Sequence, residues 1–216
     1  MKKDDYEMLR NKLLEYIEKQ LANQGAINVD GTFQIELYKE EKDYLEKHPE
    51  ILEGLDKKVL VLEKGSSRFQ EVYIEMCNKE TDELLAEEPS TFLDQPIQYF
   101  YEHLEEFMYL ESPWFDMIGV DAISFEMDSV FKTYDVMFGL KLQKKFEPML
   151  KAFFKMNLKG ENSNFNAMFN SNEGIWDVNF SINDLEQYRA DWTVQEAYHA
   201  VYRFLFALRE YIEEKS

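Results

Sequence analysis

The sequence holds a single pair of residues with the spacing of a metal-binding motif, Glu196 and His199. In a helix, side chains three residues apart lie on the same face, and di-iron bundles use such Glu-x-x-His pairs together with further glutamates. The other histidines do not complete the set, because the order around His103 is reversed and His48 stands in a charged stretch. One such pair is close to chance in an acidic chain. We therefore predict no metal site, with Glu196 and His199 as the candidates to be checked.

A nucleophile is the next chemistry to consider, and the one cysteine is Cys77. With Tyr73 and Met76 it falls on the apolar side of a helix predicted after Ser66 or Ser67. A nucleophilic thiol needs an exposed, electropositive setting, so we predict a buried core cysteine. One cysteine cannot form an internal disulfide, and the fold therefore needs no oxidising compartment.

Motifs that bind phosphates or cofactors are absent from the sequence. The 8 glycines form neither a P-loop nor a dinucleotide fingerprint, and there is no Gly-x-Ser-x-Gly elbow. These absences favour a protein that is not an enzyme, although an enzyme stays open as the alternative, and we expect no cofactor.

The strongest compositional feature is charge, with 24 Lys+Arg against 43 Asp+Glu and a formal net charge of -19. This charge repels phosphate backbones and anionic membrane surfaces, so neither nucleic acid nor a membrane is expected as a direct partner. A basic protein is electrostatically favoured. Acidic residues also stand where a signal peptide has its apolar stretch, and no run of about 18 apolar residues occurs. We expect a cytoplasmic protein.

Hydrophobic periodicity predicts mostly helices in the first half of the chain. We expect helices over 4–23, over much of 39–55 with a break at His48-Pro49, over about 67–88 and over 96–110. Short strands are expected at 33–37 and 59–62, with a turn at 28–32. Ser112 and Pro113 have the pattern of a helix start that Gly119 closes.

The second half alternates strands and helices. Hairpins are predicted from 123–127 with 134–142, and from 165–169 with 175–182. A helix follows each hairpin, over 144–158 and over 193–214, where Thr193 and Glu196 have capping-box spacing. The fold class is therefore α+β, with an antiparallel sheet of at least four strands, ββαββα in the C-terminal half, packed with N-terminal and C-terminal helices. We predict one domain over 1–216. The alternative is two lobes, 1–110 mostly helical and 111–216 ββαββα.

Two functions remain in view. The first is a non-enzymatic interaction protein, such as an immunity protein, antitoxin or inhibitor, that offers an acidic and aromatic surface to a basic partner. The second is an enzyme or small-ligand-binding domain with a pocket between the C-terminal sheet and its helices. The candidate ligand-binding residues of that pocket are Trp176, Asn179, His199 and Tyr202.

Three segments carry a resemblance: Phe92–Ile97, Tyr109–Phe115 and Ile175–Phe180. On these the chain resembles a family of small uncharacterised proteins of spore-forming Gram-positive bacteria, some of them labelled branched-chain amino acid aminotransferases. The resemblance spans most of the chain and implies no functional residues. Transamination needs a Schiff-base lysine, a partner for the cofactor ring nitrogen and a phosphate cup, and no pattern in the sequence supplies them.

Overall fold

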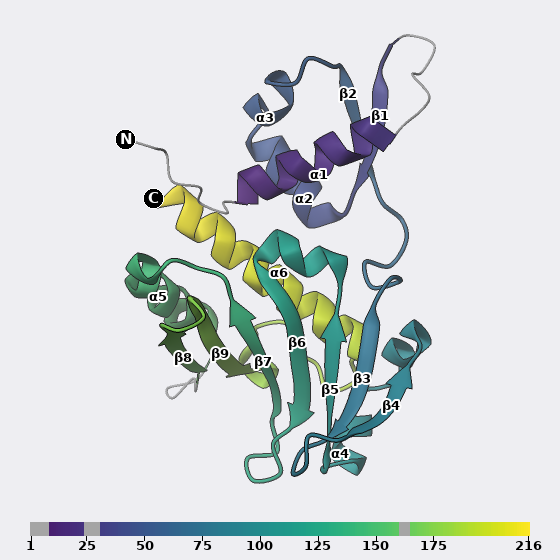
Figure 1. Ribbon diagram of the computed structural model, residues 1–216, viewed down its shortest axis with the longest axis vertical. Coiled ribbons are helices and arrows are strands. Elements are labelled where there is room, and N and C mark those ends of the chain that lie inside the picture. Colours follow the sequence, from purple (N-terminus) through teal and green to yellow (C-terminus); the bar gives the residue numbers. More distant parts are fainter. Residues whose placement is uncertain (1–8, 24–30, 160–164) are drawn as a thin grey trace. The chain divides into compact units, whose positions relative to one another are not determined.

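The computed structural model describes residues 9–23, 31–159 and 165–216 (Figure 1). The chain divides into two compact units, Met1–Arg68 and Phe69–Ser216, called here the N-terminal and the C-terminal unit. The start of the helix predicted at residue 4 and most of the turn predicted at 28–32 lie outside the described residues. The division differs from the alternative split near Leu110, which falls inside a strand of the C-terminal unit.

The N-terminal unit is built on a parallel pair of strands, called here the small sheet. Its elements are α1 (Leu9–Asn23), β1 (Phe33–Leu37), α2 (Lys39–Lys47), α3 (Glu50–Glu53) and β2 (Val59–Glu63). The strands predicted at 33–37 and 59–62 and the helix break at His48-Pro49 are confirmed. β1 alternates as predicted, with Phe33, Ile35 and Leu37 buried.

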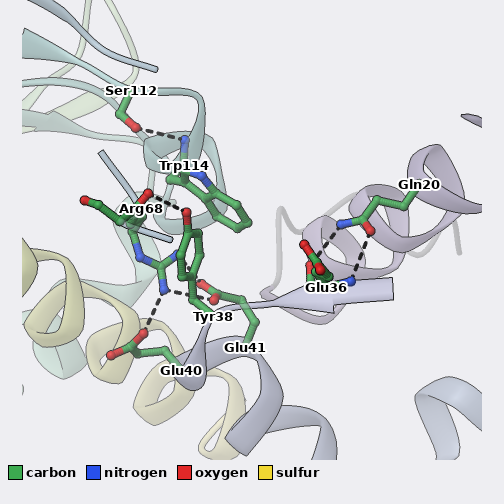
Figure 2. A network of polar contacts seen from close by, with 9 residues as sticks. Gln20, Glu36, Tyr38, Glu40, Glu41, Arg68, Ser112 and Trp114 are labelled. Carbon is green, nitrogen blue, oxygen red and sulfur yellow. Dashed lines mark hydrogen bonds and ion pairs between the residues drawn. The ribbon is translucent and has the colours of Figure 1, made fainter. Parts of the chain in front are cut away.

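A buried ion network ties the end of this unit to the start of α2 (Figure 2). The Arg68 guanidinium donates to both carboxylate oxygens of Glu41, at 2.8 and 2.9 Å, and to Glu40 at 2.7 Å. Arg68 also lies 4.3 Å from the Tyr38 ring centroid, and the Tyr38 hydroxyl donates to the Ser67 carbonyl at 2.7 Å. The side chains of Arg68 and Glu41 are fully buried, so the pairing offsets a large desolvation cost.

The C-terminal unit contains an antiparallel seven-stranded sheet, called here the large sheet, in the order β4-β3-β5-β6-β7-β9-β8. The strands are β3 (Tyr73–Asn78), β4 (Leu84–Glu88), β5 (Glu106–Glu111), β6 (Val120–Met127), β7 (Tyr134–Leu140), β8 (Phe165–Asn170) and β9 (Ile175–Ser181). The helices are η1 (Ser90–Asp94), α4 (Tyr99–Glu102), η2 (Pro113–Ile118), η3 (Lys144–Phe146), α5 (Glu147–Asn157), η4 (Ile182–Asp184) and α6 (Val194–Glu214).

One face of the large sheet is covered by helices. Phe125 of β6 packs against Tyr198 of α6 and Phe100 of α4, and Phe180 of β9 packs against both α5 and α6. α6 begins with the predicted capping box, in which Thr193 and Glu196 each accept from the other's backbone N–H. In Figure 1 α5 and α6 lie behind the strands of this unit. The α+β fold and both C-terminal hairpins are confirmed.

The helix predicted over about 67–88 is wrong, because the segment forms the hairpin of β3 and β4. Ile74 and Met76 are buried with the period of a strand. The turn is built by Asn78, whose Oδ1 accepts from the N–H of Glu80 and Thr81, and Asp82 takes a positive φ of 55°. Asn and Asp tolerate this conformation through local hydrogen bonds, and that turn signal was missed.

The helix predicted over 96–110 is also wrong beyond its first turn. Ile97 and Phe100 are buried as expected, but α4 ends at Glu102 and the chain continues as β5. β5 lies between β3 and β6 in the sheet. Its aromatic and apolar residues fit a pleated surface as well as a helix, and only the neighbouring strands decide between the two.

The short helix predicted after Ser112 is confirmed. The Ser112 hydroxyl accepts from the Trp114 N–H, and Gly119 closes η2 with a left-handed φ of 68°. A Cβ at Gly119 would lie 1.6 Å from the Arg209 guanidinium, which itself donates to the Ile118 and Lys141 carbonyls. None of the described helices combines the length and apolar character needed to cross a membrane.

Candidate functional site

The four residues predicted to line a pocket do not all share one surface. Trp176 is buried on the covered face of β9, where its Nε1 donates to the Leu142 carbonyl at 3.0 Å. Asn179 is exposed, and its Oδ1 accepts from the N–H of Asn166 on β8. Because side chains alternate along a strand, Trp176 and Asn179 point to opposite faces of the sheet. The structure therefore separates these two candidates.

The other candidates lie on α6. Tyr202 is fully buried, and the His199 ring lies 4.8 Å from the Phe69 ring. Glu196 serves the capping box and also lies 3.4 Å from Arg189. In the part of the chain that the structure describes, no group of three or more His, Cys, Asp or Glu side chains is arranged to hold a metal ion. A ligand pocket built on these residues stays a prediction.

The large sheet has a second face that points away from α5 and α6, called here the outer face. It carries every residue that alternates with the buried ones along the strands. Glu75, Tyr109, Ser124, Met137 and Asn179 follow one another across it in register. In Figure 1 this face is turned toward the viewer and carries no α-helix among the described residues of its own unit.

Carboxylates dominate the outer face. Its acidic residues are Glu75, Glu87, Glu111, Asp121, Glu126, Asp135 and Asp177. Lys141 lies among them, 2.5 Å from Asp121, and Lys79 lies 3.6 Å from Glu126. Acidic residues thus exceed basic ones along the described strands of this face.

Two pairs of acidic residues stand directly opposite each other on this face. Glu75 pairs with Glu87 across β3 and β4, and Glu126 pairs with Asp135 across β6 and β7. Like charges in directly opposite positions destabilise a sheet. The outer face therefore carries two like-charge pairs, of which the second is partly offset by Lys79 beside Glu126. Violations of local rules of this kind concentrate at functional sites.

The second of these pairs is partly shielded from water. Burial raises the pKa of Glu126, which the nearby Lys79 ammonium partly offsets. Burial also raises the pKa of Asp135, against a hydrogen bond from the Thr133 hydroxyl at 3.0 Å. Both carboxylates would gain from a further cation beside them.

Tyrosines extend the acidic surface with hydrogen-bonded rings. The Tyr73 hydroxyl donates to Glu75 at 2.5 Å, and this bond raises the pKa of Tyr73 to about 12. The Tyr109 hydroxyl donates to Glu111 at 2.9 Å. Burial, and to a smaller extent this bond, raise the pKa of Tyr109 to about 12. Each tyrosine hydroxyl is thus bonded to a carboxylate, and a carboxylate beside an aromatic ring suits guanidinium and ammonium groups.

An apolar hairpin tip stands at one end of the large sheet. Val130 and Phe131, between β6 and β7, are 78% and 73% exposed. Asp128 Oδ1 accepts from both of their N–H groups at 2.7 Å, and Lys132 takes a positive φ of 58°. The tip is therefore a turn whose conformation is fixed by hydrogen bonds to Asp128. Exposed aromatic side chains of this kind serve as anchors in protein interfaces.

Sequence reasoning found the charge of this surface and not its location. The residues of β3, β4 and β5 fall within the helices predicted over about 67–88 and 96–110, and those helices would not align their acidic residues with Glu126 and Asp135. Asn78 and Asp82 were the signals that could have revealed the hairpin. In comparisons with models of protein families, with curated proteins and with solved structures, nothing matches this chain.

Proposed function

We propose that this protein binds a basic protein partner through the outer face of the large sheet. The observation that carries the proposal is the pair of like-charged cross-strand contacts, Glu75 with Glu87 and Glu126 with Asp135, on a face that also holds tyrosines. A partner's lysine or arginine placed at either pair would turn repulsion into attraction.

The charge of the whole chain supports the same class of partner. A net charge of -19 steers cations toward the protein at long range. The carboxylates and tyrosines of the outer face then supply short-range contacts with guanidinium groups. An inhibitor, antitoxin or immunity protein directed at a basic target fits this description, and so does a mimic of nucleic-acid charge.

The test compares two charge-matched variants as baits in a native lysate. Glu87→Lys with Asp177→Lys changes the outer face, whereas Glu173→Lys with Glu214→Lys places the same charge at exposed positions off that face. Proteins recovered by the wild type at low salt are identified, and the basic ones are purified for titration at increasing salt.

The outer-face variant should lose those basic proteins while the control retains them. Equal loss from both variants would mean that net charge alone attracts the partner, and that result overturns the proposal. Recovery of no basic protein at low salt overturns it as well. Phe131→Ala, made in the wild-type background, then tests whether the hairpin tip contributes an anchor.

A further inference from the structure

The two outer edges of the small sheet differ in the hydrogen bonding of their backbone groups. In the parallel ladder, Phe33 donates to the Lys58 carbonyl and Lys64 donates to the Leu37 carbonyl. Since the backbone groups of a strand alternate in direction, those of Glu36 point away from β2. The Gln20 side chain of α1 meets them there, donating to the Glu36 carbonyl at 3.1 Å and accepting from its N–H at 3.3 Å (Figure 2). One amide thus closes the outer edge of β1.

No described side chain closes the outer edge of β2 in this way. The same alternation directs the N–H and C=O groups of Val59, Val61 and Glu63 away from β1. Within residues 9–23, 31–159 and 165–216, no group donates a hydrogen bond to the carbonyl oxygens of these three residues. None accepts a hydrogen bond from their N–H groups either. An unprotected apolar edge of this kind is a template for another strand.

The surroundings of this edge are apolar. Leu60 and Leu62 are 46% and 37% exposed on one face of β2. On the other face a groove of about 390 Å³ lies beside Val59 and Val61, between β2 and the α2–α3 segment, with Leu45 and Leu52 among its lining residues. A two-stranded sheet is marginally stable, and added strands stabilise it. The edge therefore offers both backbone hydrogen bonds and apolar area to an incoming strand.

The sequence of this edge is complementary to itself. In an antiparallel pairing with a twofold axis at Leu60, Val59 stands opposite Val61 of a second copy, and Lys57 stands opposite its Glu63. Asp56 then faces Lys64 of that copy. The outward-pointing residues face one another, as hydrogen-bonded pairs require. An axis at Val61 would instead place Lys58 opposite Lys64, so charge selects the register centred on Leu60.

We propose that two copies of this chain associate through β2, which joins their small sheets into one continuous four-stranded sheet, β1-β2-β2-β1. The proposal is independent of the basic partner inferred for the outer face. The charged side chains that set the register now make other contacts. Glu63 lies 3.4 Å from Lys42 in an exposed pair, and the Lys57 and Lys64 ammonium groups lie over the Phe33 and Tyr38 rings at 4.6 and 5.3 Å. Exposed contacts of this kind contribute little, so exchanging them for pairs across the twofold axis costs little.

The test measures the oligomeric state of the full chain by sedimentation velocity over a range of concentrations at physiological salt. The wild type should dimerise. Lys57→Glu and Glu63→Lys should each raise the dissociation constant at least about tenfold, because the symmetry turns two attractive pairs into repulsive ones. The double variant Lys57→Glu with Glu63→Lys should restore the dimer.

Lys155→Glu is the control for net charge, since it makes the same change as Lys57→Glu at an exposed position of α5. Leu60→Lys places two lysines on the twofold axis and should abolish the dimer. It should leave the fold of each copy intact, because the Leu60 side chain is exposed. A wild type that stays monomeric overturns the proposal. So does a dimer that these changes leave intact, or a charge swap that fails to restore it.

Amide hydrogen exchange gives a second readout that does not depend on any variant. The amides of Val59, Val61 and Glu63 should become protected as the protein concentration rises. Those of Leu60 and Leu62, which the ladder directs toward β1, should be protected at every concentration. Fast exchange at Val61 in a sample that sedimentation shows to be dimeric would contradict the β2 contact.

Discussion

The two sheets of this protein differ in which of their surfaces can bind another molecule. The large sheet has several strands and a face covered by aromatic residues of α4, α5 and α6. Its edge strand β4 ends in Glu87-Glu88 and is followed by Pro89. Charges and proline blunt such an edge. In the small sheet, Gln20 bonds to the outer edge of β1, whereas no described residue bonds to the outer, apolar edge of β2. The large sheet is therefore suited to binding through its face and the small sheet through its edge.

The units also differ in what is buried in them. The N-terminal unit buries Arg68 with Glu41, whereas the C-terminal unit buries aromatic pairs such as Phe154 with Phe180 and Phe204. A buried ion pair is costly to break, while an apolar layer is lost gradually with area. The tryptophans Trp114, Trp176 and Trp192 all belong to the C-terminal unit. Their fluorescence therefore reports that unit separately from the rest of the chain.

The largest expected effect is that of Arg68→Ala. Removing the guanidinium leaves Glu41 buried without its main partner, which should cost about 3–5 kcal/mol of the stability of the N-terminal unit. Circular dichroism should show an early transition, while tryptophan fluorescence keeps the wild-type midpoint. Arg10→Ala, which breaks the exposed pair with Glu50 at 3.1 Å, should cost below about 1 kcal/mol. Similar losses for both variants would show that the buried and the exposed ion pair contribute alike to stability.

Gly119→Ala tests the C-terminal unit in the same way. The new methyl group would collide with Arg209 and would need a left-handed backbone, so we expect a loss of about 2–4 kcal/mol, visible in tryptophan fluorescence. Gly174→Ala is the matched control, because its φ is also positive at 75° but nothing lies within 4 Å of the added Cβ. An equal effect at both positions would show that the contact with Arg209 is unimportant.

Gln20→Glu tests the closure of the β1 edge. A carboxylate cannot donate to the Glu36 carbonyl, so the variant should lose about 1 kcal/mol. Hydrogen exchange at the Glu36 amide should accelerate while the exchange of Ile35 changes little. Gln34→Glu introduces the same charge on the exposed side of β1 and should leave the Glu36 amide protected. Unchanged exchange in Gln20→Glu would mean that the edge is protected by other means.

The smallest effect is expected from Asp135→Asn, and it depends on pH. Burial raises the pKa of Asp135, so the folded state holds this proton more tightly than the unfolded state. The stability contributed by this group is fully present below its unfolded pKa and is lost as pH rises through its folded pKa. Above that range Asp135→Asn should be more stable than the wild type by several tenths of a kcal/mol, a difference that vanishes near pH 3. Asp177→Asn, at an exposed position of the same face, should show a smaller difference in the same thermal unfolding series.

Much of the C-terminal half could be predicted because its signals are local. Alternation in β6, β7 and β9, the proline in the first turn of α5 and the capping box of α6 each act within a few residues. The segments that became β3 and β5 carry aromatic residues compatible with either period. Their state was decided by pairing with strands distant in sequence, and two helix predictions failed there.

The same division holds for function. The sequence by itself determined the acidity of the protein, its wealth of aromatic residues and the self-complementary order of Asp56 to Lys64, because these are properties of composition and of one short segment. Only the tertiary structure decided that Glu75, Glu87, Glu126 and Asp135 share one face, and that no described strand pairs with the outer edge of β2. Both depend on strand register, which is set by contacts between residues far apart in the chain.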